Sequence, residues 1–236
     1  MTALIRHLLT ALGTLPGQLP ARLVGLVLAT GLSWTLAQSG LDRMHLFALQ
    51  RYGYSASEVV GGWRHMLEES RSLADDEKLK AVNLFFNRRM RFNSDQAIWG
   101  VPDYWATPLE FMGMGQGDCE DFAIAKYISL LLLGVPNERL RLIYVRARFG
   151  GSSILNSEAH MVLGYYADPA GEPVILDSLL NSIRPAATRT DLTPIFSFNS
   201  QGLWVPGASS TGADPTARLS RWRDVLDRIK TDGIQL

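Results

Sequence analysis

Apolar side chains recur at two different periods along the chain. From residue 55 to about residue 133 they return every three or four positions, which is typical of amphipathic helices. Capping-box spacing predicts a helix from Ser55, and the pattern predicts a second helix from Asp75. A third helix is predicted over residues 118–133 and should be buried, because it is almost wholly apolar after its first turn. Asp214-Pro215 then opens a terminal amphipathic helix.

After residue 140 the pattern changes to the alternation of strands. Residues 140–148 alternate apolar with basic side chains, residues 160–166 are apolar and aromatic, and residues 174–179 are β-branched and then apolar. The short polar turn at residues 168–171 should join the last two strands into an antiparallel hairpin. Helices followed by strands predict a single α+β domain over residues 38–236.

The segment between these two parts, residues 93–117, has no regular period. It contains Pro102, Pro108 and several aromatic residues. An irregular loop of this length either shapes a functional site or folds over the core, and the sequence leaves both interpretations open.

The first 37 residues are typical of a secretory signal peptide. An uncharged, mostly apolar run over residues 23–36 follows Arg22 and precedes Ala37. The run is shorter than the roughly 20 apolar residues of a spanning helix, so a permanent membrane anchor is the weaker interpretation. We therefore predict cleavage after Ala37 and export to the periplasm.

Composition excludes several functional classes. The chain has 23 basic and 23 acidic residues and no basic run, so it lacks the electrostatic field that holds nucleic acid. A single cysteine excludes an intrachain disulfide and a multi-cysteine zinc site. Any chemistry of Cys119 is therefore the chemistry of one thiol.

Cys119 lies one residue inside the predicted start of the central helix, after a glycine-rich turn. At a helix start the macrodipole and the free backbone N–H groups stabilise a thiolate. The alternative is a small buried hydrophobic residue, which is the commonest fate of a free cysteine. A turn-flanked helix start and an oxidising compartment favour a reactive role.

A nucleophilic thiol needs a base and a group that orients the base. Of the histidines after the signal peptide, His45 lies near the mature start, and His65 falls on an amphipathic helix beside a basic residue. His160 begins the predicted hairpin, and the position opposite it falls within about two residues of Asp177. The candidate catalytic set is therefore Cys119, His160 and Asp177.

Three acidic residues flank the thiol and oppose its ionisation. Asp118 and Asp121 have the spacing of a helix cap, whereas Asp118, Glu120 and Asp121 together offer the oxygen ligands that calcium prefers. Spacing alone favours capping.

Several stretches resemble one known family. These are residues 103–110 (DYWATPLE), 113–127 (GMGQGDCEDFAIAKY), 140–145 (LRLIYV), 159–163 (AHMVL) and 175–178 (ILDS). Together they closely resemble the bacterial transglutaminase-like cysteine proteinases, and within these the periplasmic branch that trims large surface adhesins. The resemblance covers most of residues 40–205.

The resemblance implies a papain-like, transglutaminase-like fold in which the central helix packs on an antiparallel sheet. It also implies Cys119 as nucleophile, His160 as base and Asp177 as orienting acid. It further implies calcium dependence with Asp118 and Glu120 as ligands, which reverses the preference for capping, and leaves Asp121 as a lesser candidate ligand. The implied partners are a large adhesin as substrate and an inner-membrane cyclic di-GMP receptor that sequesters the protease.

Three other functions remain open at this stage. A transglutaminase or an amidase would use the same three residues, Cys119, His160 and Asp177 could instead hold zinc, and a calcium-binding adaptor would need no nucleophile. If the chain is an acyl-transfer enzyme, the backbone N–H of Cys119 supplies one oxyanion donor. The second donor is not identified, with Trp105 and Gln116 as weak candidates.

Overall fold

The structure is a computed structural model that describes residues 40–148, 157–206 and 219–235. The predicted signal peptide, residues 1–37, and the predicted start of the last helix at Asp214-Pro215 lie outside the described residues. Across the part of the chain that is described, every helix is too short or too polar to cross a bilayer.

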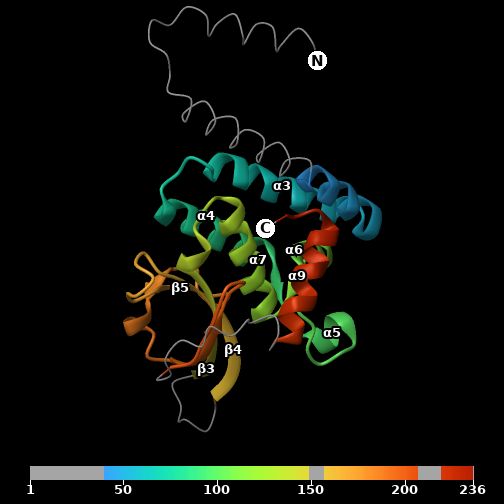
Figure 1. The fold of residues 1–236 in the computed structure, drawn as a ribbon. Coiled ribbons are helices and arrows are strands. Elements are labelled where there is room, and N and C mark those ends of the chain that lie inside the picture. Colours follow the sequence, from blue (N-terminus) through green and yellow to red (C-terminus); the bar gives the residue numbers. More distant parts are fainter. Residues whose placement is uncertain (1–39, 149–156, 207–218, 236) are drawn as a thin grey trace, which may run out of the picture. The chain divides into compact units, whose positions relative to one another are not determined.

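The first layer of the fold is helical. A helix over residues 40–52 leads into α3 (Tyr54–Ser70) and α4 (Asp75–Arg89), which pack together (Figure 1). The α4 helix begins at Asp75 as predicted. The predicted capping box at Ser55 is wrong, because the chain turns at Gly53, whose φ of 86° favours glycine, and α3 begins directly after it. Ser55 therefore lies inside the first turn instead of capping it.

The segment 93–117 is more regular than its sequence pattern indicates. It contains α5 (Asp95–Trp99) and α6 (Pro108–Met114), and the short strands β1 (Arg91–Phe92) and β2 (Gln116–Gly117) pair in parallel around it. The expectation of an unstructured loop was wrong because each helix is too short to show a period. The capping box of Thr107 and Glu110 that starts α6 was nevertheless present in the sequence.

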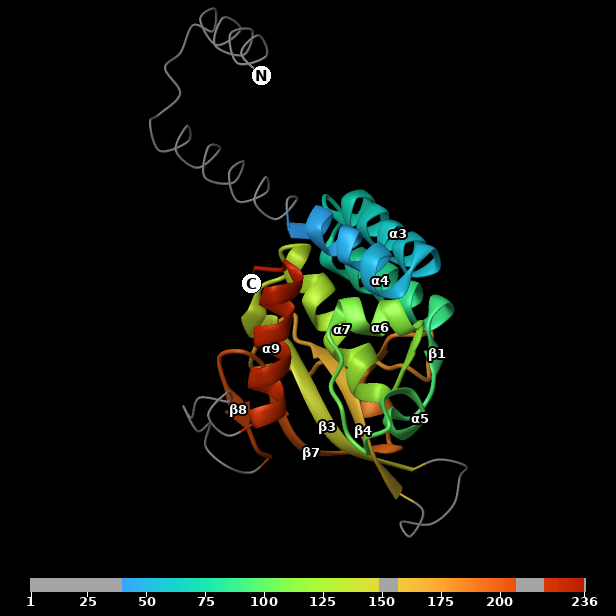
Figure 2. The ribbon, with the colours of Figure 1, turned by 90° about the vertical axis from the view of Figure 1, so that its right-hand side faces the viewer.

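The predicted central helix is α7 (Cys119–Leu132). It ends before Gly134, whose φ of 80° turns the chain out of the helix. Its contacts are with α4 and α6 on one side and with β3 and β4 of the sheet on the other (Figure 2). The helix is therefore buried between two layers, as its apolar sequence requires.

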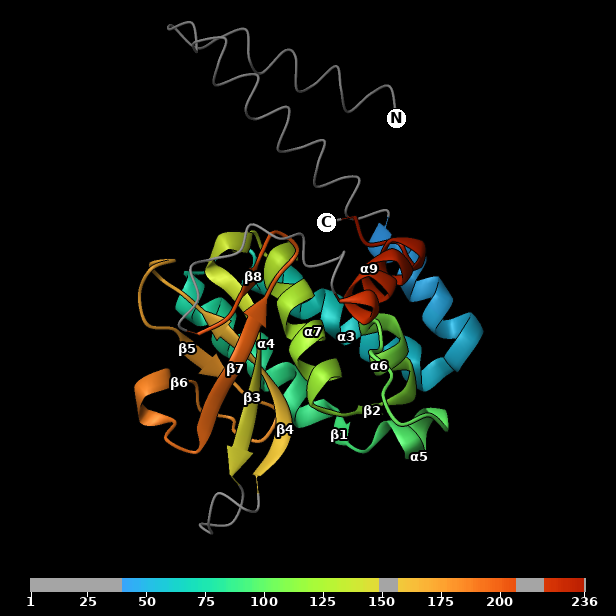
Figure 3. The ribbon, with the colours of Figure 1, turned by 60° about the horizontal axis from the view of Figure 1, so that its bottom comes forward.

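The second layer is a six-stranded sheet in the order β6-β5-β4-β3-β7-β8, and all neighbouring pairs are antiparallel (Figure 3). Its strands are β3 (Leu140–Arg148), β4 (Ser157–Tyr165), β5 (Val174–Leu176), β6 (Arg184–Pro185), β7 (Leu192–Phe198) and β8 (Leu203–Trp204). The last helix, α9 (Ser220–Asp232), docks Trp222 against the rings of Tyr127 and Phe198. A central helix on an antiparallel sheet confirms the predicted α+β, transglutaminase-like class.

Candidate functional site

Cys119 is the first residue of α7, and its side chain is 7% exposed. Its thiol donates to Oε2 of Glu120 over 2.7 Å, and burial raises the pKa of the thiol, which the backbone N–H of Met161 in β4 offsets in small part. Met161 follows His160 directly. The start of the helix is therefore held against the strand that carries the histidine.

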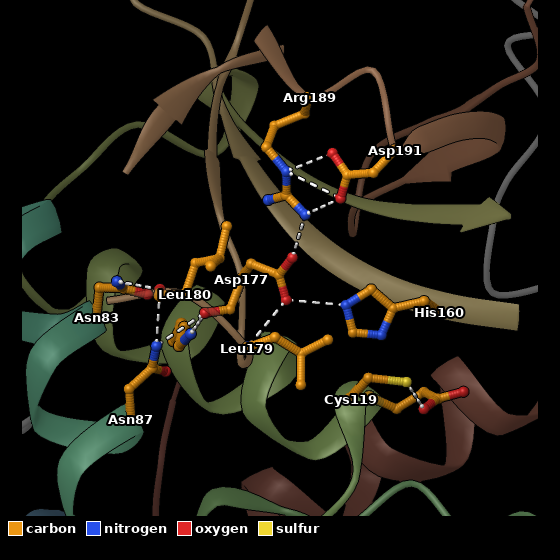
Figure 4. A network of polar contacts seen from close by, with 11 residues as sticks. Asn83, Asn87, Cys119, His160, Asp177, Leu179, Leu180, Arg189 and Asp191 are labelled. Atoms are coloured by element: carbon orange, nitrogen blue, oxygen red, sulfur yellow. Dashed lines mark hydrogen bonds and ion pairs between the residues drawn. The ribbon is translucent and has the colours of Figure 1, made fainter. Parts of the chain in front are cut away.

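His160 and Asp177 form a buried pair. Nε2 of His160 lies 2.9 Å from Oδ1 of Asp177, and both side chains are almost completely buried. Figure 4 shows the imidazole joined to Asp177, with Cys119 below the ring in this view at the start of α7. The structure thus pairs His160 with Asp177 as the sequence predicted, and the role of Cys119 beside them stays a prediction.

The hairpin register explains how Asp177 reaches the imidazole. Leu163 pairs with Leu176, so Asp177 lies two positions from the residue that would face His160. The β5 strand ends at Leu176, three residues earlier than predicted, because Oδ1 of Asp177 accepts from the backbone N–H of Leu179 and turns the chain. Asp177 is therefore held by side-chain and turn contacts just beyond the ladder.

The carboxylate of Asp177 is fully provided with donors. Besides His160 and Leu179, Arg189 donates from Nη2 to Oδ2 over 2.7 Å, and Arg189 is itself held by Asp191. Burial alone would raise the pKa of Asp177, but the bonds from His160, Leu179 and Arg189 outweigh burial and hold the pKa well below its usual range. Asp177 therefore stays ionised beside the imidazole.

A second group of carboxylates lies at the start of α7. Asp95 of α5 joins Asp118 and Asp121, and one oxygen from each lies within 4.8 Å of the others. Tyr104 N–H donates to Asp95 over 2.6 Å, and Ala106 N–H donates to Asp121 over 2.7 Å. Asp95 was missed at the sequence level because it lies in the short helix α5, far from the motif along the chain.

This acid group is short of donors. Within the described residues, Oδ1 of Asp95 and Oδ1 of Asp118 are buried and receive no hydrogen bond. Burial, followed by the charges of neighbouring acids, raises the pKa of Asp118 to about 10, and burial raises that of Asp121 to about 8. Oxygen atoms that are buried, crowded and without donors fit a hard cation such as calcium.

Comparisons with known proteins agree with this geometry. A family model described as the bacterial transglutaminase-like cysteine proteinase matches residues 63–205. The chain belongs to this family. A solved structure of Legionella pneumophila LapG is 35% identical over 80% of this chain and 97% of that chain, with a TM-score of 0.68. An EGTA-treated LapG from the same organism is 36% identical over 80% of this chain and 97% of that chain, with a TM-score of 0.69. A calcium-bound LapG is 35% identical over 80% of this chain and 98% of that chain, with a TM-score of 0.68. No match was found among proteins with curated functions.

In this cysteine proteinase the acids beside the thiol have separate contacts. Asp118 and Asp121 share the donor-poor group with Asp95, and they also form the capping box at the start of α7 that their spacing predicted, in which Asp121 accepts from the Asp118 N–H over 3.3 Å. Glu120 instead faces the thiol. Burial, then the charges of Glu120 and Asp118, raise the pKa of the Cys119 thiol. Without a compensating positive charge, the thiol is held protonated.

The remaining candidates of the sequence have other contacts. His45 bonds Ser57 over 2.7 Å, and His65 pairs with Glu69 on the surface. Trp105 stacks on Phe198, and Gln116 accepts from Asn93. Whether Trp105 or Gln116 serves as the second oxyanion donor stays a prediction.

Proposed function

We propose that the protein is a calcium-dependent cysteine endopeptidase in which Cys119 is the nucleophile, His160 the general base and Asp177 the orienting acid. The observation that carries this proposal is the buried 2.9 Å pair of His160 and Asp177 next to a cysteine at a helix start. Such a pair fixes the tautomer and the direction of the imidazole, which is what activation of a thiol requires.

The reaction follows from these positions. His160 takes the proton of the Cys119 thiol, and the sulfur attacks the peptide carbonyl and forms a C–S bond. The negative charge that develops on the carbonyl oxygen is met by the backbone N–H of Cys119 at the start of α7. His160 then gives its proton to the departing amine as the C–N bond breaks, which leaves a thioester. Water, deprotonated by His160, hydrolyses the thioester and returns the thiol.

Asp95, Asp118 and Asp121 would hold the calcium ion, since the buried oxygens of Asp95 and Asp118 that receive no hydrogen bond among the described residues are suited to ligate it. When bound, the cation supplies the positive charge that offsets the acids next to Cys119 and so favours the thiolate. Glu120 accepts the hydrogen bond of the Cys119 thiol, so it would influence the protonation of Cys119 and is a weaker candidate for a calcium ligand. The existence of calcium-bound and EGTA-treated structures of the related LapG supports this choice of metal.

The substrate and the control of the enzyme are inferred from the family resemblance. We propose that the protein acts in the periplasm, where it cleaves the amino-terminal region of a large surface adhesin between small residues. Cleavage would release the adhesin from the outer membrane and promote biofilm dispersal. An inner-membrane cyclic di-GMP receptor of the LapD type would sequester the protease while the nucleotide is abundant.

The test is incubation of the purified protein with the amino-terminal segment of a co-encoded giant adhesin, in calcium and in EGTA. We expect one defined fragment in calcium, none in EGTA, and none with the Cys119→Ala variant. Failure of the wild-type protein to cut in calcium would refute the proposal.

The same preparation separates the other functions. Incorporation of a labelled amine in place of cleavage would indicate a transglutaminase, and full function of Cys119→Ala would indicate a calcium-binding adaptor. A zinc site of Cys119, His160 and Asp177 has less support. Among the described residues these three do not form one of the groups with metal-binding geometry, and Nε2 of His160 is occupied by Asp177.

A further inference from the structure

Lys126 is a fully buried lysine in the middle of α7. Its Nζ donates to the backbone carbonyl of Asp177 over 3.0 Å and lies 5.7 Å from the centre of the Phe122 ring. Burial lowers the pKa of Lys126 to about 7, and either protonation state can donate this bond. An apolar side chain would fill the same space without the cost of desolvating an amine. Packing alone therefore does not account for a lysine at this position, and its hydrogen bond to Asp177 points to a further role.

Position along α7 links this lysine to the nucleophile. Cys119 and Lys126 are seven residues apart, which is two helical turns, so they share one face of the helix. Cys119 meets β4 beside His160, and Lys126 meets the residue that orients His160. One rigid helix therefore sets the positions of the thiol and of the acid's backbone.

A second helix holds the same carbonyl. Asn87 of α4 donates from Nδ2 to the carbonyl of Asp177 over 2.8 Å and to that of Leu180 over 3.0 Å (Figure 4). Asn83, one turn earlier, contacts the carbonyls of Leu180 and Asn181 but not that of Asp177. The chain after β5 is thus held by two helices, with two donors on the Asp177 carbonyl itself.

The donors Lys126 and Asn87 take the place of the β-sheet hydrogen bonds that Asp177 lacks. Because β5 ends at Leu176, the strand pairing does not extend to the acid. We propose that Lys126 and Asn87 are positioning residues, which hold the backbone of Asp177 so that its carboxylate stays in register with His160. This inference rests on the proposed roles of Cys119, His160 and Asp177.

The test measures the reactivity of the thiol without a protein substrate. In calcium, the rate of Cys119 alkylation by iodoacetamide is compared for wild type, Lys126→Met and Asn87→Ala. A displaced acid misorients the imidazole, so we expect each variant to react about 10-fold more slowly. Asn83→Ala is the matched control and should react at close to the wild-type rate, since its contacts are restricted to the following carbonyls.

Double variants that also carry Asp177→Ala distinguish a positioning role of Lys126 and Asn87 from a general role in packing. Asp177→Ala keeps the carbonyl that Lys126 and Asn87 bind but removes the carboxylate. If the two donors act through that carboxylate, adding Lys126→Met or Asn87→Ala to Asp177→Ala produces no further slowing. The inference is overturned if the single variants react within about twofold of wild type, or if they slow the Asp177→Ala protein by the same factor as wild type.

This result is distinguishable from failure of the proposed function. Loss of adhesin cleavage by the wild-type protein would refute the protease proposal, yet alkylation rates would still report on the positions of the three groups. With an active wild type, Lys126→Met should lower kcat and leave KM near its original value, because Lys126 is fully buried and has no exposed surface for a peptide to contact.

Discussion

Two acidic sites belong to the region of Cys119, namely Asp177 with its donors and the group of Asp95, Asp118 and Asp121, and their pKa values are shifted in opposite directions. Asp177 is almost fully buried but receives bonds from His160, Leu179 and Arg189, and its pKa is lowered. In the group of Asp95, Asp118 and Asp121, within the described residues, two buried oxygens receive no hydrogen bond, and the pKa of each acid is raised. Burial raises the pKa in both groups, but at Asp177 hydrogen-bond donors and the charge of His160 outweigh it, whereas neighbouring acids raise the pKa further in the second group.

This contrast indicates whether each group is stabilised by the polypeptide itself or requires a bound ligand. The Asp177 group is complete in the polypeptide and can hold His160 in place as soon as the chain folds. The acid group is incomplete, since its like charges repel and its oxygens lack partners, and a cation would complete it. On the proposed mechanism, the ionisation of the thiol would depend both on the Asp177–His160 pair and on a cation bound by the acid group.

The largest effect should come from breaking the complete group. Asp177→Asn keeps the shape of the side chain but removes the charge that orients and stabilises the imidazole. We expect kcat/KM for cleavage to fall by about 10² to 10⁴. Steady-state cleavage of the adhesin segment in saturating calcium measures this loss.

Asp191→Asn is the matched control for that variant. Asp191 also binds Arg189 but is not among the contacts of His160, so its loss should leave activity close to wild type. If Asp177→Asn keeps more than about a tenth of the wild-type activity, Asp177 is not the orienting acid.

The two groups also differ in how far the sequence predicts them. Cys119 and His160 could be selected because a helix start and a hairpin are local features with a readable pattern. Asp177 followed from counting residues across one turn, and the observed register agrees with the count to within two residues. Helix α7 and strand β3 likewise match their predicted positions to within a residue.

The donors and ligands that complete each group could not be read in this way. Asp95 reaches the acid group because β1 and β2 bring the ends of segment 93–117 together, and this pairing of two residues per strand leaves no sequence period. Arg189, Lys126 and Asn87 contact Asp177 from different elements. Such long-range contacts depend on the tertiary fold and have no local pattern.

A smaller effect should come from supplying or withdrawing the ligand of the incomplete group. If calcium binds the folded acid group and not the unfolded chain, then at about 100 times its Kd it should raise the free energy of unfolding by about 2.7 kcal/mol. Asp95→Asn should remove most of this gain. In EGTA the same variant should be at least as stable as wild type, because it removes an acid whose ionised form is disfavoured by burial and by neighbouring acids. Urea unfolding in calcium and in EGTA measures both.

Asp103→Asn is the control for the calcium experiment. Asp103 pairs with Arg221 at the surface and is not a member of the acid group. This variant should keep the full gain in stability from calcium. An equal gain in Asp95→Asn would exclude Asp95 as a ligand.

The last effect we expect is a pH dependence whose sign differs between the two groups. The acids of the incomplete group have a raised pKa, about 8 for Asp121 and about 10 for Asp118, against about 4 in an unfolded chain. In EGTA the folded state therefore binds more protons than the unfolded state between pH 4 and 8, and the free energy of unfolding falls as pH rises. Asp177 acts in the opposite direction, because its lowered pKa gives stability that is present above about pH 4 and lost only below it.

Calcium should abolish the decline, because a bound cation keeps these acids ionised in the folded state and so removes the difference in bound protons. Urea unfolding between pH 5 and 8 should therefore show a falling curve in EGTA and a flat or rising one in saturating calcium. Two parallel curves would mean that the acid group does not exchange protons for calcium. In that case Asp177 and the group of Asp95, Asp118 and Asp121 would differ in their geometry but not in proton binding. The ionisation of Cys119 would then have to be set by His160 without help from the metal.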